Sequence, residues 1–160
     1  MDDYEKYLFR GKRKDNGEWV EGFYGIDTIC TEQDTYLSTV ISKIPKRIYD
    51  CESWEVDPDT VEIFTNSTDK NRTKIFEGDI VQAFTRYGTK HIYPIKYRNG
   101  TFWFGNWNWI EFLDRFQFRE VIGNIHDNPE MLNAAAKDIA ADAAQSGLAP
   151  AMENFELMGG

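Results

Sequence analysis

The chain has 160 residues and a formal net charge of −9, and 41% of its residues are hydrophobic. This content suffices for a folded core and excludes a mainly disordered chain, and the length allows one domain or two small ones that support each other. No apolar run approaches the roughly 20 residues that cross a bilayer, and the start, Met-Asp-Asp-Tyr-Glu-Lys, is acidic where a signal peptide is basic and then apolar. A cytoplasmic protein without a membrane partner is therefore expected.

A mainly β fold is expected, beginning with an antiparallel sheet module over residues 1–68. The segments with strand-like composition are 7–13, 18–24, 35–44 and 47–56. Asn16-Gly17 lies between the first two and suits a tight hairpin turn, because both residue types tolerate positive φ. Asp57-Pro58 has the residue types of a helix start and predicts a single helical turn.

A second β module is expected over residues 69–128, after a polar connector. Its predicted strands are 74–77, 80–84, 91–97, 101–104 and 118–125. Short strands at this spacing suit an SH3-like β-barrel. Pro94 cannot donate to a ladder, so its strand is expected at an edge or at a bulge. Residues 109–116 fit either a helical turn or a wide loop.

Residues 129–160 predict a C-terminal α-helical extension and a tail. Asn128-Pro129 repeats the residue types of a helix start, and the alanine-rich segment that follows has high helix propensity up to Gly147. The tail carries Met152, Phe155 and Leu157 on an acidic background. We expect it either to dock on a partner or neighbouring subunit, or to be a frayed terminus.

Three stretches of the chain share the pattern of one known family. They are Val56-Asp57-Pro58-Asp59-Thr60-Val61, the run from Asp69 to Val81, and Val121-Ile122-Gly123-Asn124-Ile125-His126-Asp127-Asn128-Pro129-Glu130. Together with the opening Phe9-Arg10-Gly11-Lys12, they resemble the YopX-like proteins of bacteriophages and prophages. The resemblance implies a phage origin, synthesis in the host cytoplasm and an SH3-like fold, but it specifies no reaction.

The resemblance departs from the family pattern at one position and stops before the C-terminus. In the family a glycine usually follows Asp-Lys-Asn, and Arg72 stands there in this chain. If that position requires positive φ, either Arg72 is strained or the turn differs from that of the family. The pattern ends near residue 132, so residues 133–160 are an extension specific to this protein.

The residues that could carry out chemistry argue against an enzyme. Cys30, Cys51, His91 and His126 are the only cysteines and histidines, whereas a closed zinc site takes about four such ligands in one place. Two separate thiols suit a reducing cytosol better than a disulfide. Neither a phosphate-binding loop motif nor a nucleophile elbow occurs. The sequence therefore predicts a non-enzymatic protein with no cofactor and no metal.

The aromatic run between residues 102 and 118 is the strongest functional lead. It holds eight aromatic side chains, more than a small barrel can bury, so part of it is expected to meet a partner protein or a second subunit. The residues assigned to this interface are Trp103, Trp107, Trp109 and Phe112, with Met152, Phe155 and Leu157 of the tail. Core packing between the modules and base stacking on nucleic acid are the alternatives. Phosphate contacts for the second alternative would be Arg86, Lys90, Lys96 and Arg98.

Acidic and basic residues are segregated along the chain. Residues 50–69 carry seven acidic and no basic side chains, whereas residues 70–128 carry nine basic and six acidic ones. Glu52, Glu55 and Asp59 in the acidic segment most simply form a solvated face, and otherwise a site for a cation or a basic partner.

These observations support three functional hypotheses. The first is a phage or prophage accessory protein that acts through contacts with host or phage proteins and self-associates. The second is a single-stranded nucleic-acid binder that uses the basic, aromatic module. The third is an acidic mimic of nucleic acid that inhibits a host factor through Glu52, Glu55 and Asp59.

Overall fold

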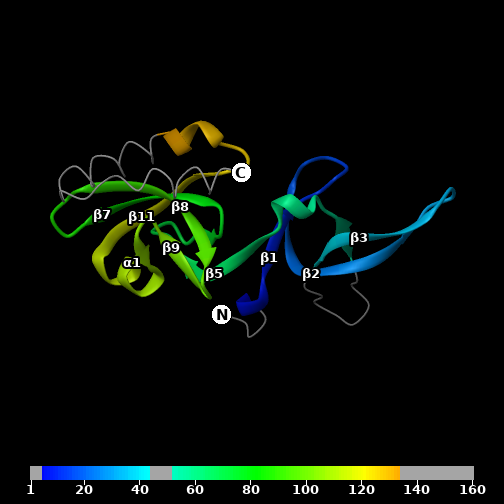
Figure 1. The fold of residues 1–160 in the computed structure, drawn as a ribbon, viewed down its shortest axis with the longest axis horizontal. Coiled ribbons are helices and arrows are strands. Elements are labelled where there is room, and N and C mark those ends of the chain that lie inside the picture. The colour runs from blue at the N-terminus through cyan, green and yellow to red at the C-terminus, as the bar shows by residue number, and fades with distance from the viewer. Residues whose placement is uncertain (1–4, 44–51, 134–160) are drawn as a thin grey trace. The chain divides into compact units, whose positions relative to one another are not determined.

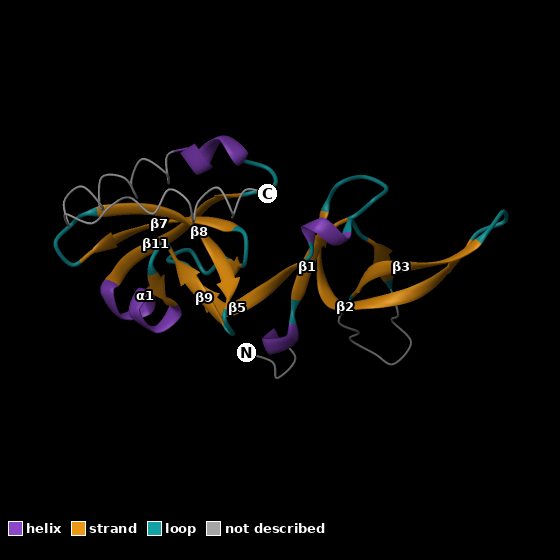
Figure 2. Ribbon diagram, in the orientation of Figure 1, coloured by secondary structure: helices purple, strands orange, loops and turns teal. Residues whose placement is uncertain are grey.

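The computed structural model describes residues 5–43 and 52–133. The chain divides into two compact units, the first formed by residues 1–67 with 74–76 and the second by residues 68–73 with 77–160. Each unit is built around one antiparallel sheet, and strands make up most of its regular structure (Figures 1 and 2). The mainly β fold expected from the sequence is confirmed.

Unit 1 contains a six-stranded sheet with the strand order β4-β3-β2-β1-β5-β6. Its strands are β1 (Phe9–Lys12), β2 (Trp19–Cys30), β3 (Thr35–Ser42), β4 (Ser53–Glu55), β5 (Glu62–Thr68) and β6 (Lys74–Phe76). The 3-10 turns are η1 (Glu5–Tyr7) and η2 (Pro58–Thr60). The predicted helical turn at Asp57-Pro58 is η2, and the Asp57 carboxylate caps it by accepting a hydrogen bond from Asp59 N at 3.0 Å.

The predicted N-terminal hairpin is present, with β1 and β2 antiparallel and Lys12 opposite Trp19. Gly17 adopts a φ of 73° in the connecting turn, as the turn chemistry requires. Gly22 further along β2 fills a tight place, because a Cβ there would lie 2.0 Å from the carbonyl oxygen of Ser42. Only glycine fits at this position, where β2 passes Ser42 of β3.

The hairpin of β2 and β3 extends past the other strands of its sheet, as Figure 1 shows. Pairing of β1 with β2 ends at Gly22, and pairing of β4 with β3 covers only Val40 to Ser42. The two strands nevertheless remain paired with each other as far as Cys30 opposite Thr35. We call residues 25–38 the arm, because there β2 and β3 pair with each other alone among the named strands.

Unit 2 contains a five-stranded sheet with the order β10-β9-β8-β7-β11. Its strands are β7 (Asp79–Thr85), β8 (Lys90–Arg98), β9 (Thr101–Phe104), β10 (Trp107–Asn108) and β11 (Phe116–Asn124). Its helical elements are α1 (Trp109–Arg115) and the 3-10 turn η3 (Pro129–Met131). The segment left open by the sequence is therefore a helix, started by a capping box between Asn108 and Glu111.

Two features of the second sheet differ from the expectation. Strand β8, which contains Pro94, is not at an edge but lies between β7 and β9. Pairing with β9 begins only at Ile95, so Pro94 interrupts no pairing on that side. Within the described residues the strand pairs leave the sheet open between β10 and β11, so the SH3-like barrel is not confirmed.

The segment 74–77, expected in the second module, instead supplies β6 to the sheet of unit 1. Its Ile75 and Phe76 are buried there, and the hydroxyl of Thr65 donates to Ile75 O at 2.7 Å. A tight turn built on Asp69 brings the chain back beside β5, since the Asp69 carboxylate accepts hydrogen bonds from Asn71 N and Thr73 N. Arg72 in this turn has a φ of 65°, so the position does require the left-handed conformation.

The C-terminal extension lies largely outside the described residues. Its first turn, η3, follows Asn128, which makes no side-chain capping hydrogen bond. The helix predicted beyond residue 133 and the tail residues Met152, Phe155 and Leu157 lie outside the described residues.

Candidate interaction surface

Three residues of the aromatic run lie in the core of unit 2. Phe104, Phe112 and Phe116 are all at most 1% exposed. Their ring centroids lie 4.4 Å apart for Phe104 and Phe112, and 5.1 Å apart for Phe104 and Phe116. The expectation that Phe112 lies at a partner interface is wrong, because α1 turns its ring inward onto β9 and β11.

The three tryptophans assigned to the same interface are partly exposed but already packed. Trp109 lies 5.1 Å from Phe112, and Trp107 lies 5.0 Å from Phe116. Trp103 lies under the guanidinium of Arg98 at 4.5 Å and donates its indole N–H to Arg98 O at 3.1 Å. Part of the tryptophan surface that was expected to meet a partner is thus covered by contacts within unit 2.

The four basic residues considered for nucleic acid do not form one site. Arg86 and Lys90 flank the turn between β7 and β8, whereas Lys96 and Arg98 lie toward the other end of β8. Eight steps along the extended strand lead from Lys90 to Arg98, which corresponds to about 26 Å. Burial lowers the pKa of Lys96, so it is poorly suited to act as a solvated phosphate contact.

The acidic residues are engaged in local structural contacts. Glu55 accepts hydrogen bonds from Lys14 Nζ at 2.8 Å, from the Ser38 hydroxyl at 2.6 Å and from the Tyr36 hydroxyl at 3.1 Å. Lys14 and Ser38 together hold the pKa of Glu55 below its ordinary value. Glu52 pairs with Lys43 at 3.1 Å, whereas Asp59 is exposed.

The Ser38, Lys14 and Glu55 contacts do not amount to a catalytic dyad. The hydrogen bond from Lys14 to Glu55 raises the pKa of Lys14. The Lys14 ammonium therefore stays protonated and cannot take a proton from Ser38. The described residues contain no group of three or more histidine, cysteine, aspartate or glutamate side chains that could hold a metal ion. None of the described helices is long and apolar enough to cross a membrane.

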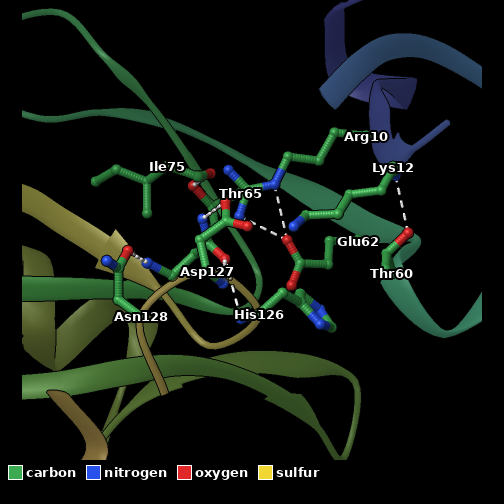
Figure 3. Close-up of polar contacts among 10 residues, drawn as sticks. Arg10, Lys12, Thr60, Glu62, Thr65, Ile75, His126, Asp127 and Asn128 are labelled. Atoms are coloured by element: carbon green, nitrogen blue, oxygen red, sulfur yellow. Dashed lines mark hydrogen bonds and ion pairs between the residues drawn. The ribbon is translucent and has the colours of Figure 1, made fainter. Parts of the chain in front are cut away.

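One polar centre was missed by the sequence reasoning. Arg10 of the opening Phe-Arg-Gly-Lys motif pairs with Glu62 at 2.6 Å, with side chains only 12% and 5% exposed (Figure 3). The Arg10 guanidinium also lies 4.6 Å from the ring of Trp19 and 4.7 Å from that of Phe76. The signal available in the sequence was a cationic residue, Arg10, within an apolar strand. In the structure Arg10 belongs to a polar centre that joins motifs far apart in the sequence.

The same region in Figure 3 shows how the motif backbone is held. Lys12 N donates to the Thr60 hydroxyl at 2.8 Å. That hydroxyl donates in turn to Asp57 O at 2.7 Å. Gly11 lies under Val56, since a Cβ on Gly11 would approach the Val56 side chain to 3.3 Å. The Phe-Arg-Gly-Lys and Asp-Pro-Asp-Thr stretches therefore support each other structurally.

The arm carries the most exposed apolar surface of unit 1. Ile26 is 69% exposed and Leu37 is 73% exposed. The strand register places Ile26 opposite Thr39 and Thr28 opposite Leu37, so these side chains share one face of the arm. The arm residues of that face are Ile26, Thr28, Cys30, Thr35 and Leu37, and none of them is charged. We call this set the arm face.

Sequence reasoning did not single out the arm face. Its strands alternate apolar and polar residues like any half-buried strand, and nothing local indicates that no other element covers them. The only signal was the length of β2, which runs for 12 residues and so exceeds the usual five or six.

Comparison with known proteins identifies a family and a similar solved structure. Residues 8–133 match the family described as YopX protein. No curated protein matches the chain. The chain is similar to the protein in the crystal structure of protein EF1440 from Enterococcus faecalis, with 23% identity, coverage of 78% of this chain and 96% of that chain, and a TM-score of 0.45.

Proposed function

The chain belongs to the YopX family, and from this premise we propose that it is a non-enzymatic phage or prophage accessory protein of the host cytoplasm that works through protein–protein contacts and self-associates. The proposal includes an SH3-like fold for unit 2. The single observation that carries it is the exposed, uncharged arm face. Exposed apolar surface of this kind marks interaction sites in soluble proteins.

A second copy of this chain is the partner that suits the arm face best. In a two-fold contact the same patch meets itself, so a charged patch would bring like charges together. The arm face avoids this cost because threonine, cysteine, isoleucine and leucine are its only residue types. Ile26 and Leu37 would supply the apolar centre of the contact, and the threonines its polar rim.

The charge of the arm disfavours nucleic acid as its partner. Residues 25–38 contain Asp27, Glu32 and Asp34 and no basic residue, and contacts with phosphates depend on lysine and arginine. The three carboxylates lie at the tip or on the opposite face from Ile26, so they would stay hydrated when two arm faces meet.

The test is the molecular mass of the full chain in solution, measured by size-exclusion chromatography with light scattering over a range of concentrations. We expect a dimer or larger assembly, and we expect Ile26→Lys or Leu37→Lys to shift it to monomer because each places a like-charged pair at the contact. Ile110→Lys is the matched control, since Ile110 is 80% exposed on α1 and lies outside the arm.

A wild-type chain that stays monomeric at every concentration would contradict the proposal. An assembly that survives both arm substitutions but is lost with Ile110→Lys would move the contact to α1. Circular dichroism of each variant checks whether the β structure is retained. This measurement separates loss of the contact between subunits from loss of the fold.

A further inference from the structure

A pocket of about 520 Å³ lies in unit 2, where β7 ends and β11 begins beside the C-terminal end of α1. Its lining residues are Thr85, Arg86, Tyr87, Trp107, Asp114, Arg115, Phe116 and Gln117. The volume falls within the range of about 300 to 1,000 Å³ that small-molecule sites occupy. None of the family motifs contributes to it.

The apolar part of the pocket is aromatic and firmly placed. The ring of Trp107 lies 5.0 Å from that of Phe116 and 5.3 Å from the imidazole ring of His91. These contacts hold the indole in place, while part of it stays exposed. Tyr87 at the rim is 79% exposed. Flat rings in this arrangement suit another flat ring, which would stack on them rather than fill a deep cavity.

The polar part of the pocket is dominated by two arginines. The Arg86 guanidinium lies 4.7 Å from the centroid of the Tyr87 ring, which is a cation–π contact. The ion pair of Arg115 with Glu111 spans 3.8 Å, too long for a hydrogen bond, so it does not use the Arg115 donors. Against these two positive charges, the described residues of the lining include one carboxylate, that of Asp114.

We propose that this pocket binds a nucleotide, a planar base joined to a phosphate. The base would stack on Tyr87 and Trp107, since aromatic side chains hold any base by its face. The phosphate would accept paired hydrogen bonds from Arg115, whose planar fork matches phosphate oxygens. The amide of Gln117 and the hydroxyl of Thr85 can pair with base or sugar atoms.

The charge of the lining indicates how many phosphates the ligand carries. Two arginines and one aspartate sum to one net positive charge, which balances a monophosphate better than a triphosphate. A nucleotide can arrive free or as one residue of a single strand, and both present the same base and phosphate. The net charge of −9 on the whole chain works against a long strand, because charge at a distance repels further phosphates.

Isothermal titration calorimetry of the full chain with thymidine 5′-monophosphate tests the proposal. We expect saturable binding, with thymidine alone and inorganic phosphate alone each binding at least about tenfold more weakly, because each keeps only one of the two contacts. Arg115→Gln and Tyr87→Ala should each weaken binding by about 10- to 100-fold. Both side chains are mostly exposed, so neither change should affect folding.

Arg13→Gln is the matched control, because Arg13 belongs to unit 1 and pairs with Asp15 at the surface. It should leave the dissociation constant unchanged. An oligothymidylate of about 10 nucleotides forms the second arm of the test. Tighter binding of the strand than of the mononucleotide identifies single-stranded nucleic acid as the source, and equal or weaker binding identifies the free nucleotide.

The proposal is overturned if no saturable binding occurs up to millimolar mononucleotide, or if Arg115→Gln and Tyr87→Ala both bind as the wild type does. Binding of inorganic phosphate as tight as that of the nucleotide would also overturn it, because the aromatic walls would then contribute nothing. The site lies outside the arm, so these results do not depend on whether the chain self-associates.

Discussion

The two units of this protein have cores of different kinds. In unit 1 a buried ion pair between Arg10 and Glu62 lies between the rings of Trp19 and Phe76. One apolar cluster of this unit consists of Leu8, Phe64 and Phe76, and Ile41, Val56 and Ile75 are also fully buried. Polar and apolar contacts therefore share the task of holding its strands together.

In unit 2 a cluster of aromatic rings packs with the buried aliphatic side chains of Ile80, Val81 and Ile95. Phe112 is the centre of a set of ring contacts, at 4.4 Å from Phe104, 5.1 Å from Trp109 and 5.7 Å from Phe116. Edge-on and tilted ring pairs of this kind add about 0.5–1.5 kcal/mol each beyond the burial of area.

The comparison teaches that the density of apolar residues in the sequence does not locate the exposed apolar surface. Most of the aromatic run packs within unit 2, where α1 folds back over the sheet, although Phe118 is 67% exposed. The arm has an ordinary strand composition, yet it exposes Ile26 and Leu37 because no described element lies over it. Four variants test this contrast between the two units.

Phe112→Ala should have the largest effect. Removing a fully buried ring leaves a cavity among the remaining rings, so we expect a loss of about 3–5 kcal/mol in the free energy of unfolding. Chemical denaturation followed by tryptophan fluorescence measures it. Ile110→Ala on the exposed side of the same helix should change the stability by less than about 0.5 kcal/mol, and equal losses for the two variants would contradict the assignment of Phe112 to the core.

Glu62→Gln should come next, because it removes the negative charge from a buried ion pair. Breaking a buried pair by removing one partner costs about 3 kcal/mol or more. Hydrogen exchange should show the loss in β1 and β5 and not in the strands of unit 2. Glu21→Gln is the control, because its ion pair with Lys74 is largely exposed; a loss equal to that of Glu62→Gln would show that burial of the pair does not matter.

Arg72→Gly tests a turn rather than a core. Arg72 has a φ of 65°, a conformation that costs a residue with a Cβ about 1–2 kcal/mol, while glycine loses about 0.5–1 kcal/mol through its greater freedom when unfolded. We therefore expect a net gain of up to about 1 kcal/mol in thermal or denaturant unfolding. Asn99→Gly, at a φ of 52°, should gain less because asparagine tolerates this region, and a destabilised Arg72→Gly variant would contradict the argument.

Glu55→Gln should have the smallest effect, and it should depend on pH. Since Lys14 and Ser38 lower the pKa of Glu55 in the folded chain, the carboxylate stabilises the fold above its ordinary pKa of 4.5, and this contribution disappears as the pH falls through the lowered value. Urea unfolding should show the wild type more stable than the variant at pH 7, with the difference closing in acid. A constant difference across that range would rule out titration of Glu55 as its source.

Local patterns predicted most of the strands and turns. Asn16-Gly17 and Asn99-Gly100 gave hairpin turns where expected, Gly17 and Gly100 both at positive φ, and Asp57-Pro58 gave η2. The strained Arg72 was also foreseen, because the family pattern has glycine there. These features depend on a few adjacent residues, so adjacent residues suffice to predict them.

The candidate sites could not be predicted in the same way. The arm face depends on where pairing with β1 and β4 stops, and the nucleotide pocket joins residues from β7, β10, α1 and β11. No motif spacing encodes either of them. Arg86 was considered for nucleic acid, but Tyr87 and Arg115 were not, since only folding brings them together.

By itself, the sequence determined the strand-rich character of this protein, its turns and its family, because backbone preferences and short motifs act over a few residues. The tertiary structure alone decided that residues 74–76 join the first sheet, that Arg10 meets Glu62 across 52 positions, and that Phe112 is buried while Ile26 is exposed. Burial depends on the surface that residues distant in the chain cover, and that surface is defined only once both sheets have formed.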